Sequence, residues 1–372
     1  MDKKLFSFSI SNSLFDLAYN VGKIFSFLFF YQIFGNSLAY AIGGWVAVIF
    51  LHTFFVLISS QFMGKIGIRV SLIIATMLFF FSFLAIIFMD RSNPFPYYVA
   101  WIILYAMARS VYYIPFHLYM IHLTKSASRG EQTSKVLAIA VLLSLFVPLI
   151  GGTISSTFGL QGIAVFSAIV FLMSIIPLFN IPNYKFTFSG RLWQIFKAPP
   201  NQKEFKLLVA NDLQNKEHFW QIYCFIILGG SFLNFGILFS IINVLSFGIL
   251  WVSGRFLDHR NLKKVLHIDA IITTLVWIFR MFVYNPITIA IADTCYSLVS
   301  TSRNQVTSSI DYQLITHENT MQLLDERLVA KEVYWNLFAG TLTLISLLLA
   351  IFIDIKIVFV IAAIGSLLLL AF

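Results

Sequence analysis

Four polar side chains follow one another at helical spacing inside the first apolar stretch of the chain. At positions i, i+4, i+8 and i+11 they are Asn12, Asp16, Asn20 and Lys23. A helix places them on one face, in a segment otherwise rich in Phe, Ile and Leu. A charged group in hydrocarbon costs about 2.5–3.5 kcal/mol, so this face is expected to line a protein interior or a water-filled cavity. There a carboxylate can load and release a proton, and an ammonium group can hold an anion.

The pattern recurs about half a chain length later. Asp212 and Lys216 repeat the i, i+4 spacing, with Asn215 and Glu217 beside them. The repetition suggests a duplicated protein with a central aqueous site. The same spacing also fits a second interpretation, in which the acids and lysines of each segment form ion pairs that only hold helices together.

The composition indicates an integral membrane protein. Of the 372 residues, 59% are hydrophobic, 41 are Phe and only 11% are charged, whereas soluble domains average about 25% charged residues. The net charge of +9 is spread among short loops, which argues against nucleic acid as a partner and for the lipid bilayer as the surroundings.

Twelve stretches are long and apolar enough to cross a bilayer, which takes about 20 residues each. We expect an all-α membrane protein whose spans lie at 10–34, 38–62, 69–89, 96–122, 134–157, 161–182, 205–229, 232–253, 265–283, 286–311, 328–352 and 356–372. A polar stretch divides the spans into two sets of six. This predicts an N-terminal domain at 1–182, a cytoplasmic linker at 183–204 and a C-terminal domain at 205–372.

The loop charges predict the topology. Most of the 25 Lys and Arg residues fall in loops on the side of the N-terminus, and only Arg91 and Lys356 fall in loops on the opposite side. By the positive-inside rule, both termini are expected in the cytoplasm and the chain to be a multi-pass protein of the cell membrane (plasma or inner). Arg280 is expected near the outer interface, where its long side chain can reach the headgroups.

Two loops carry related motifs. The loop after the eighth span fits the pattern G-x-x-x-D-R-x-G-R-K/R through Gly254, Asp258, Arg260 and Lys263. The loop after the second span is a degenerate copy in which Gly67 and Arg69 fit the end of the pattern. In the fifth span, Pro148, Gly151 and Gly152 fit a second pattern, Pro-x-x-Gly-Gly.

With these motifs, the span count and the repeat, the whole chain resembles a transporter of the major facilitator superfamily. The resemblance implies two pseudo-symmetric six-helix bundles with a substrate site near the middle of the membrane. It also implies that the first, fourth, seventh and tenth helices line the cavity. The fourth and tenth add further candidates to the site, namely Arg109, Tyr113, His117, Asp293, Arg303 and Asn304.

The expected function is secondary active transport of a small solute by alternating access, coupled to protons. Efflux is slightly favoured, because the Pro-x-x-Gly-Gly pattern is associated with antiporters. Two alternatives stay open: a non-transporting receptor or scaffold with the same fold, and a lipid transporter or flippase. No P-loop or metal-ligand spacing occurs in the sequence, so we expect a protein that is not an enzyme and needs no cofactor or metal. We also expect it to be a monomer.

Overall fold

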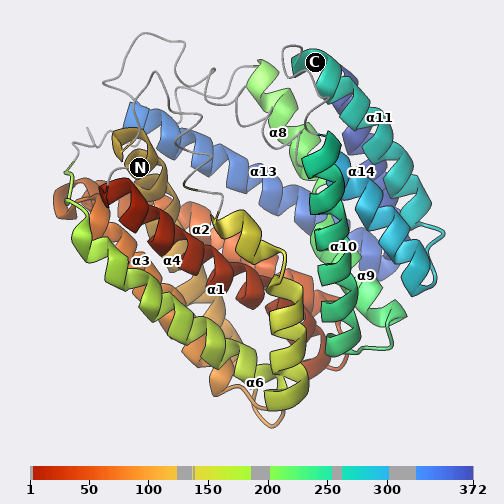
Figure 1. Ribbon diagram of the computed structural model, residues 1–372, viewed down its shortest axis with the longest axis horizontal. Coiled ribbons are helices and arrows are strands. Elements are labelled where there is room, and N and C mark those ends of the chain that lie inside the picture. Colours follow the sequence, from red (N-terminus) through yellow and green to blue (C-terminus); the bar gives the residue numbers. More distant parts are fainter. Residues whose placement is uncertain are drawn as a thin grey trace.

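The computed structural model describes residues 3–123, 136, 139–185, 202–253, 262–300 and 324–371. These residues form helices joined by short turns, with no strand among them (Figure 1). The expected all-α fold is confirmed.

The N-terminal half contains four long helices and a helical hairpin. Its elements are α1 (Lys3–Ile33), α2 (Leu38–Ile66), α3 (Ile68–Ile87), α4 (Phe95–Leu123), α6 (Val147–Ile175) and η2 (Ile176–Asn180). α2 and α3 meet at Gly67, whose φ of 90° is a conformation that favours glycine.

α6 is a hairpin of two arms rather than one long helix. Its backbone leaves the helical conformation at Gly159, which has φ 72° and ψ −179°, and Figure 1 shows the second arm folding back from the first. The two arms correspond to the expected fifth and sixth spans, and residues 139–144 form a helical turn ahead of the first arm.

The C-terminal half supplies the remaining six spans. Its elements are α8 (Gln202–Gln214), α9 (Glu217–Ile227), α10 (Phe232–Ser253), α11 (Leu262–Arg280), a helix at Pro286–Ser300, α13 (Leu324–Phe352), α14 (Lys356–Leu368) and η4 (Leu369–Ala371). α8 and α9 together take the place of the expected seventh span, which is broken at Asn215 and Lys216.

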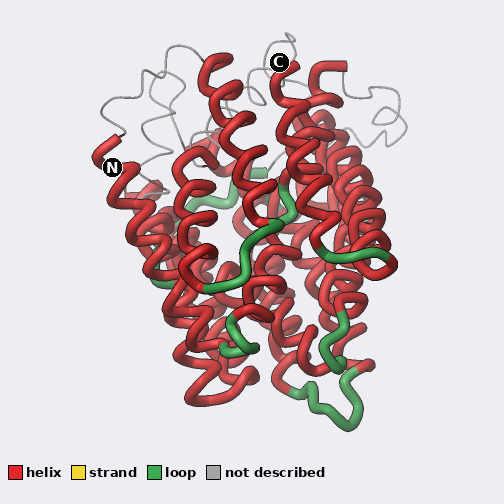
Figure 2. The backbone as a smooth tube through the Cα atoms, turned by 90° about the vertical axis from the view of Figure 1, so that its right-hand side faces the viewer, coloured by secondary structure: helices red, strands yellow, loops and turns green. Residues whose placement is uncertain are grey.

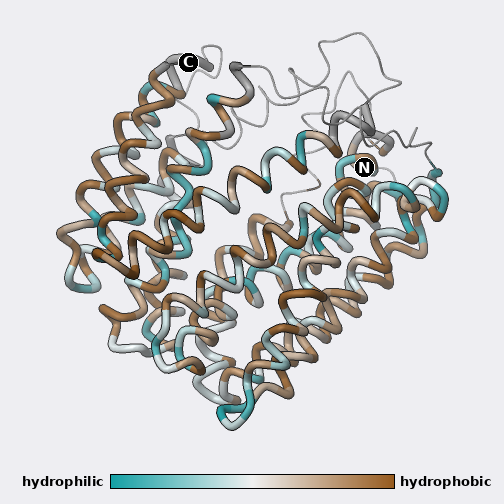
Figure 3. The backbone as a smooth tube through the Cα atoms, turned by 180° about the vertical axis from the view of Figure 1, so that it is seen from behind, coloured by the Kyte–Doolittle hydropathy of each residue, from teal (hydrophilic) through white to brown (hydrophobic). Residues whose placement is uncertain are grey.

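The outer surface of the helices suits lipid. Within the described residues, six helices are long and apolar enough to cross a membrane. Large apolar side chains point outward from them: Phe54 is 56% exposed, Phe81 48% and Ile169 53%. Hydrophobic residues dominate the helices, and hydrophilic residues cluster toward several of their ends (Figure 3). A face of this kind is unfavourable in water and favourable in a bilayer, so the chain is a multi-pass membrane protein.

In the described part of the chain, three helix pairs make the main contacts between the halves. α2 packs against α13, α6 against α10, and α1 against α9. The beginning of α1 and the end of the last helix lie at the same end of the assembly (Figure 2), as an even number of spans requires.

The α6–α10 contact depends on two glycines. A Cβ added to Gly152 would stand 2.9 Å from Cα of Gly236 and 2.7 Å from the carbonyl oxygen of Phe232. Ser240 Oγ accepts a hydrogen bond of 2.9 Å from the backbone N–H of Leu149, close to the start of α6. Small residues therefore allow the two helix backbones to approach closely across the boundary between the halves.

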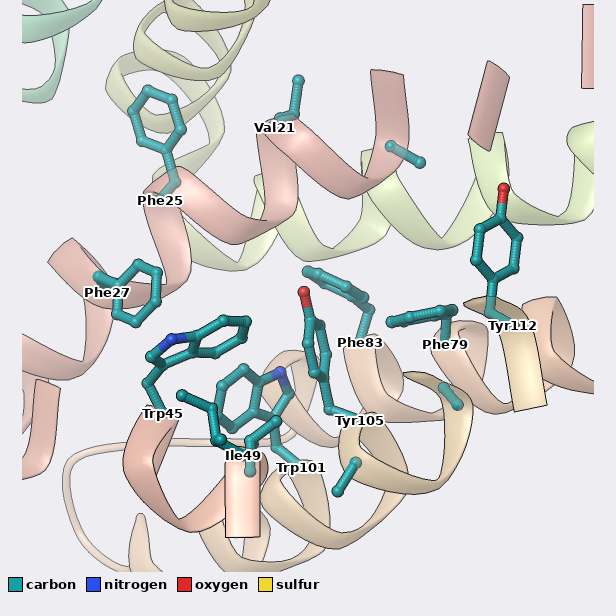
Figure 4. Close-up of a cluster of buried hydrophobic side chains, with 14 of the residues drawn as sticks. Val21, Phe25, Phe27, Trp45, Ile49, Phe79, Phe83, Trp101, Tyr105 and Tyr112 are labelled. Atoms are coloured by element: carbon teal, nitrogen blue, oxygen red, sulfur yellow. The ribbon is translucent and has the colours of Figure 1, made fainter. Parts of the chain in front are cut away.

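Aromatic rings fill the interior of the N-terminal half (Figure 4). Phe79 on α3 lies edge-on to Tyr105 on α4, with ring centroids 5.0 Å apart, and stacks on Phe171 of α6 at 5.3 Å. Gly22 on α1 leaves room for the ring of Phe83. These contacts fix α1, α3, α4 and α6 relative to one another and hold the helices that carry the polar residues described next.

Candidate functional site

Trp45 on α2 is the meeting point of three basic side chains. Nζ of Lys23, from α1, lies 5.4 Å from the centre of a Trp45 ring, and Cζ of Arg109, from α4, lies 4.8 Å from it. The ring of His218, from α9, packs edge-on at 5.4 Å. We call Lys23, Trp45, Arg109 and His218 the Trp45 cluster. It joins three helices of the N-terminal half to one of the C-terminal half.

Tyrosines extend the Trp45 cluster. The hydroxyls of Tyr19 and Tyr113 are 3.2 Å apart, Lys23 Nζ lies 5.9 Å from the Tyr19 ring, and Arg109 Cζ lies 5.3 Å from the Tyr113 ring. The hydroxyl of Tyr105 points from α4 toward α1 (Figure 4) and is buried. Tyr113, a predicted site residue, therefore does lie beside Arg109.

The two N-terminal cations are not neutralised by acids. Among the described residues, no carboxylate lies within ion-pair distance of Lys23 or Arg109, and Nε and Nη1 of Arg109 are buried without a hydrogen bond. A cation over an aromatic ring gains about 0.5–2 kcal/mol, less than the several kcal/mol that enclosing a charge costs. The rings alone therefore leave the Trp45 cluster with an uncompensated positive charge.

A second contact crosses between the halves. His52 on α2, buried two turns beyond Trp45, lies with its Nε2 3.0 Å from Oε1 of Glu332 on α13. Asn336 Nδ2 donates to the same Glu332 oxygen at 3.0 Å. The positive charge of Arg109 also acts on this carboxylate, but Glu332 is already held by His52 and Asn336.

Asp16 is not paired with Lys23. Its Oδ2 accepts a hydrogen bond of 2.9 Å from Nδ2 of Asn12, and Asn12 Oδ1 accepts one of 3.5 Å from the hydroxyl of Tyr112. The ion-pair interpretation is thus wrong for Asp16 and Lys23. Asn20 and His117 are both half-buried, and His117 packs edge-on against Phe116 at 5.5 Å.

For the C-terminal half the ion-pair interpretation holds. Lys216 Nζ lies 3.1 Å from Oδ2 of Asp212, with Lys216 buried, while Asn215 is exposed. The pair spans the break between α8 and α9, where the backbone N–H of Lys216 reaches only the carbonyl of Gln214.

Arg280 is the centre of a larger buried network. Its Nη1 lies 2.8 Å from Glu217 and its Nη2 lies 2.7 Å from Asp293, and Trp220 Nε1 donates to the same Asp293 oxygen at 2.7 Å. The guanidinium also lies over the rings of Trp220, Trp277 and Tyr296. The expectation that Arg280 reaches toward the outer interface is wrong: it is fully buried because two carboxylates and three rings surround it.

The loop motif of the N-terminal half connects the turn between α2 and α3 to the segment that follows η2. Asn183 Oδ1 accepts a hydrogen bond from the backbone N–H of Arg69, its Nδ2 donates to the carbonyl of Ile66, and Arg69 Nη1 donates to the carbonyl of Ile181. A Cβ on Gly67 would overlap Asn183. Gly67 and Arg69 therefore anchor the segment after η2.

In the fifth span the predicted glycines have different neighbours. Gly152 meets α10 as described, Gly151 faces the ring of Phe25 on α1, and Pro148 lies at the start of α6, where a missing N–H costs no helix hydrogen bond. The remaining predicted residues lie outside the described part of the chain: Arg303, Asn304, Gly254, Asp258, Arg260 and the side chain of Lys263.

No protein-family model matches the chain, and no curated protein matches it in sequence. Solved structures do match over its whole length. A mutant of the nucleoside transporter NupG is 12% identical with a TM-score of 0.70, covering 100% of this chain and 98% of that chain. A D-xylose–proton symporter is 15% identical with a TM-score of 0.68, covering 99% and 97%. The human organic anion transporter MFSD10 is 11% identical with a TM-score of 0.69, covering 99% and 98%.

The chain has the major facilitator fold.

Within the major facilitator fold, the Trp45 cluster draws on the first, second, fourth and seventh spans. Sequence reasoning pointed to the first, fourth and seventh but missed Trp45, His52 and Glu332 on the second and eleventh. Two signals for them exist: Trp45 and His52 lie at i and i+7 on one face of α2, and Glu332 is a charge inside an apolar span.

Proposed function

We propose that this chain is a secondary active transporter that moves a small solute across the cell membrane by alternating access. The observation that carries the proposal is the Trp45 cluster, in which charged and aromatic side chains of both halves meet in the interior of the helices. Buried charges inside membrane spans mark substrate and ion pathways far more often than they serve packing. The similar structures are transporters for different solutes, which agrees with the class and leaves the solute open.

In this proposal the halves, residues 1–182 and 205–372, rock against each other about the α2–α13, α6–α10 and α1–α9 contacts. The linker at 183–204 and both termini face the cytoplasm, and the protein works as a monomer in the bilayer. Coupling to protons is supported by Asp16, which has no basic partner, and by the His52–Glu332 contact between the halves. Efflux is supported by the Pro148, Gly151 and Gly152 pattern at the α6–α10 boundary.

The test of alternating access does not need the solute. Spin labels at Asn93 and Tyr284 report the distance between the halves at one end, and labels at Lys65 and Leu370 report it at the other; all four residues are exposed. We expect two populations of spin-label distance at each end. A change from neutral to acidic buffer is expected to lengthen the average distance at one end and shorten it at the other. One fixed distance at both ends under both conditions contradicts the proposal and favours a receptor or scaffold.

A further inference from the structure

The buried cations of the two halves differ in whether a carboxylate pairs with them. In the described C-terminal half, Lys216 has Asp212 within 3.1 Å, and Arg280 has Glu217 and Asp293 within 2.8 Å. Among the described residues, the neighbours found for Lys23 and Arg109 in the N-terminal half are the rings of Tyr19, Trp45 and Tyr113 and no carboxylate. The missing counter-charge is therefore local to one site.

Two donors of Arg109 are also unused. Its Nε and Nη1 are buried without a hydrogen-bond partner. Buried polar atoms are nearly always satisfied in folded proteins, and an unsatisfied donor can mark the place of a water, an ion or a ligand. A ligand with several acceptor oxygens satisfies donors of this kind, and a guanidinium suits a carboxylate or phosphate best because it donates two parallel hydrogen bonds.

The N-terminus of α9, in the seventh span, adds a partial positive charge near the Trp45 cluster. α9 begins at Glu217, and its first turn carries His218, which packs on Trp45 and on Phe27. The first N–H groups of a helix lack intrahelical partners and carry a partial positive charge. This field adds to those of Lys23 and Arg109, and the carboxylate of Glu217 in the same turn is compensated by Arg280.

From these observations we infer that the Trp45 cluster binds a small organic anion, with a carboxylate or phosphate group on Lys23 and Arg109 and a planar apolar body against the rings of Tyr19, Trp45 and Phe27. The inference rests on the proposed transport function and names the class of its solute. The anion supplies the charge that no described side chain supplies. Aromatic walls pack against a ring edge-on or offset, as Trp45 and Phe27 already pack against the ring of His218.

Calorimetric titration of the purified full chain tests the inference with four probes: benzoate, phenyl phosphate, benzamide and inorganic phosphate. We expect benzoate and phenyl phosphate to bind, and benzamide, which has the same shape without the charge, to bind at least about tenfold more weakly. Inorganic phosphate is expected to bind more weakly than phenyl phosphate. Equal affinity for benzamide and benzoate contradicts the anion, and equal affinity for the two phosphates contradicts the organic body.

Variants locate the site. Lys23→Gln and Arg109→Gln are expected to weaken benzoate binding by about tenfold or more, and Lys23→Arg to keep it within a few-fold, since the charge remains. Lys356→Gln is the matched control, because Lys356 also lies over an aromatic ring, that of Tyr223 at 6.0 Å, but outside the Trp45 cluster. Unchanged binding in both Gln variants overturns the inference.

The spin-label distances separate this inference from the proposed function. If the halves alternate and no probe anion binds, the anion inference fails while transport stands. If the halves do not alternate, the transport proposal fails, whatever binds to the Trp45 cluster. Should a Gln variant not fold, the comparison of benzoate with benzamide on the unmodified chain still decides the charge requirement.

Discussion

His52 on α2 and Glu332 on α13 meet across the boundary between the halves, with His52 Nε2 3.0 Å from Glu332 Oε1. His52 is fully buried, and Glu332 is held in place by Asn336 one turn further along α13. The contact exists only while α2 and α13 are close. It therefore stabilises the arrangement seen here relative to any arrangement in which these helices separate.

Glu332→Ala is expected to shift the halves apart at α2 and α13. The loss of this contact leaves His52 buried without its partner, which costs about 1–3 kcal/mol in the present arrangement. The ratio of this arrangement to the separated one then falls about 5- to 150-fold. The Lys65–Leu370 spin-label distance measures the shift. Asn336→Ala is the control, because it leaves the His52–Glu332 contact in place and is expected to have a smaller effect.

Arg280→Gln is expected to destabilise the protein strongly. The change leaves Glu217 and Asp293 without their shared cation, and removing one member of a buried ion pair typically costs about 3–5 kcal/mol. Thermal unfolding in detergent measures the loss. The unfolding temperature of Arg280→Lys should lie between those of Arg280→Gln and the unmodified protein, since an ammonium group cannot hold both carboxylates with the same geometry. An unfolding temperature equal to that of the unmodified protein in both variants would show that the network is dispensable.

Gly152→Ala is expected to separate α6 from α10. The new methyl group would meet the backbone of Gly236 at 2.9 Å and of Phe232 at 2.7 Å, and overpacking of this kind costs about 1–3 kcal/mol. Gly248→Ala on α10 is the matched control, because nothing lies within 4 Å of its added Cβ. We expect a lower unfolding temperature for the first variant and an equal or higher one for the second.

Asp16→Asn and Asp212→Asn are expected to behave differently. Asp16 accepts a hydrogen bond from Asn12 and compensates no cation, so Asp16→Asn should leave stability nearly unchanged and remove proton uptake into vesicles, measured with a trapped pH-sensitive dye. Asp212→Asn leaves Lys216 buried without its carboxylate and should lower the unfolding temperature. Proton uptake by Asp16→Asn at the rate of the unmodified protein would remove Asp16 from the coupling pathway.

The sequence predicts the spans and the two-half organisation well, because lipid requires long apolar helices and each leaves a strong signal. It also predicts Lys23 and Arg109 as buried charges. It does not predict their partners. Asp16 and Lys23 are two turns apart on one helix face, and this spacing does not decide whether their side chains meet. Only the packing of the helices places Asn12 between Tyr112 and Asp16.

Arg280 and Glu332 show a second limit. Arg280 is the last residue of α11, where snorkelling is the usual outcome for a charge, and Glu332 lies about two turns inside α13. Their actual surroundings come from other spans: Glu217 and Asp293 for Arg280, and His52 for Glu332. Contacts between helices far apart in the chain have no periodicity that a single sequence displays.

The break between α8 and α9 is a point at which the seventh span can bend. Helices resist bending because bending disturbs their i to i−4 hydrogen bonds, but at Lys216 such a bond is already absent. On one side, α8 is fixed to α14, where Gly365 lets its backbone approach Leu213 and Gln214; on the other, α9 carries His218 to Trp45. A movement of α9 relative to α8 therefore bends the span at Lys216, and it carries His218 together with Glu217, which is paired with Arg280.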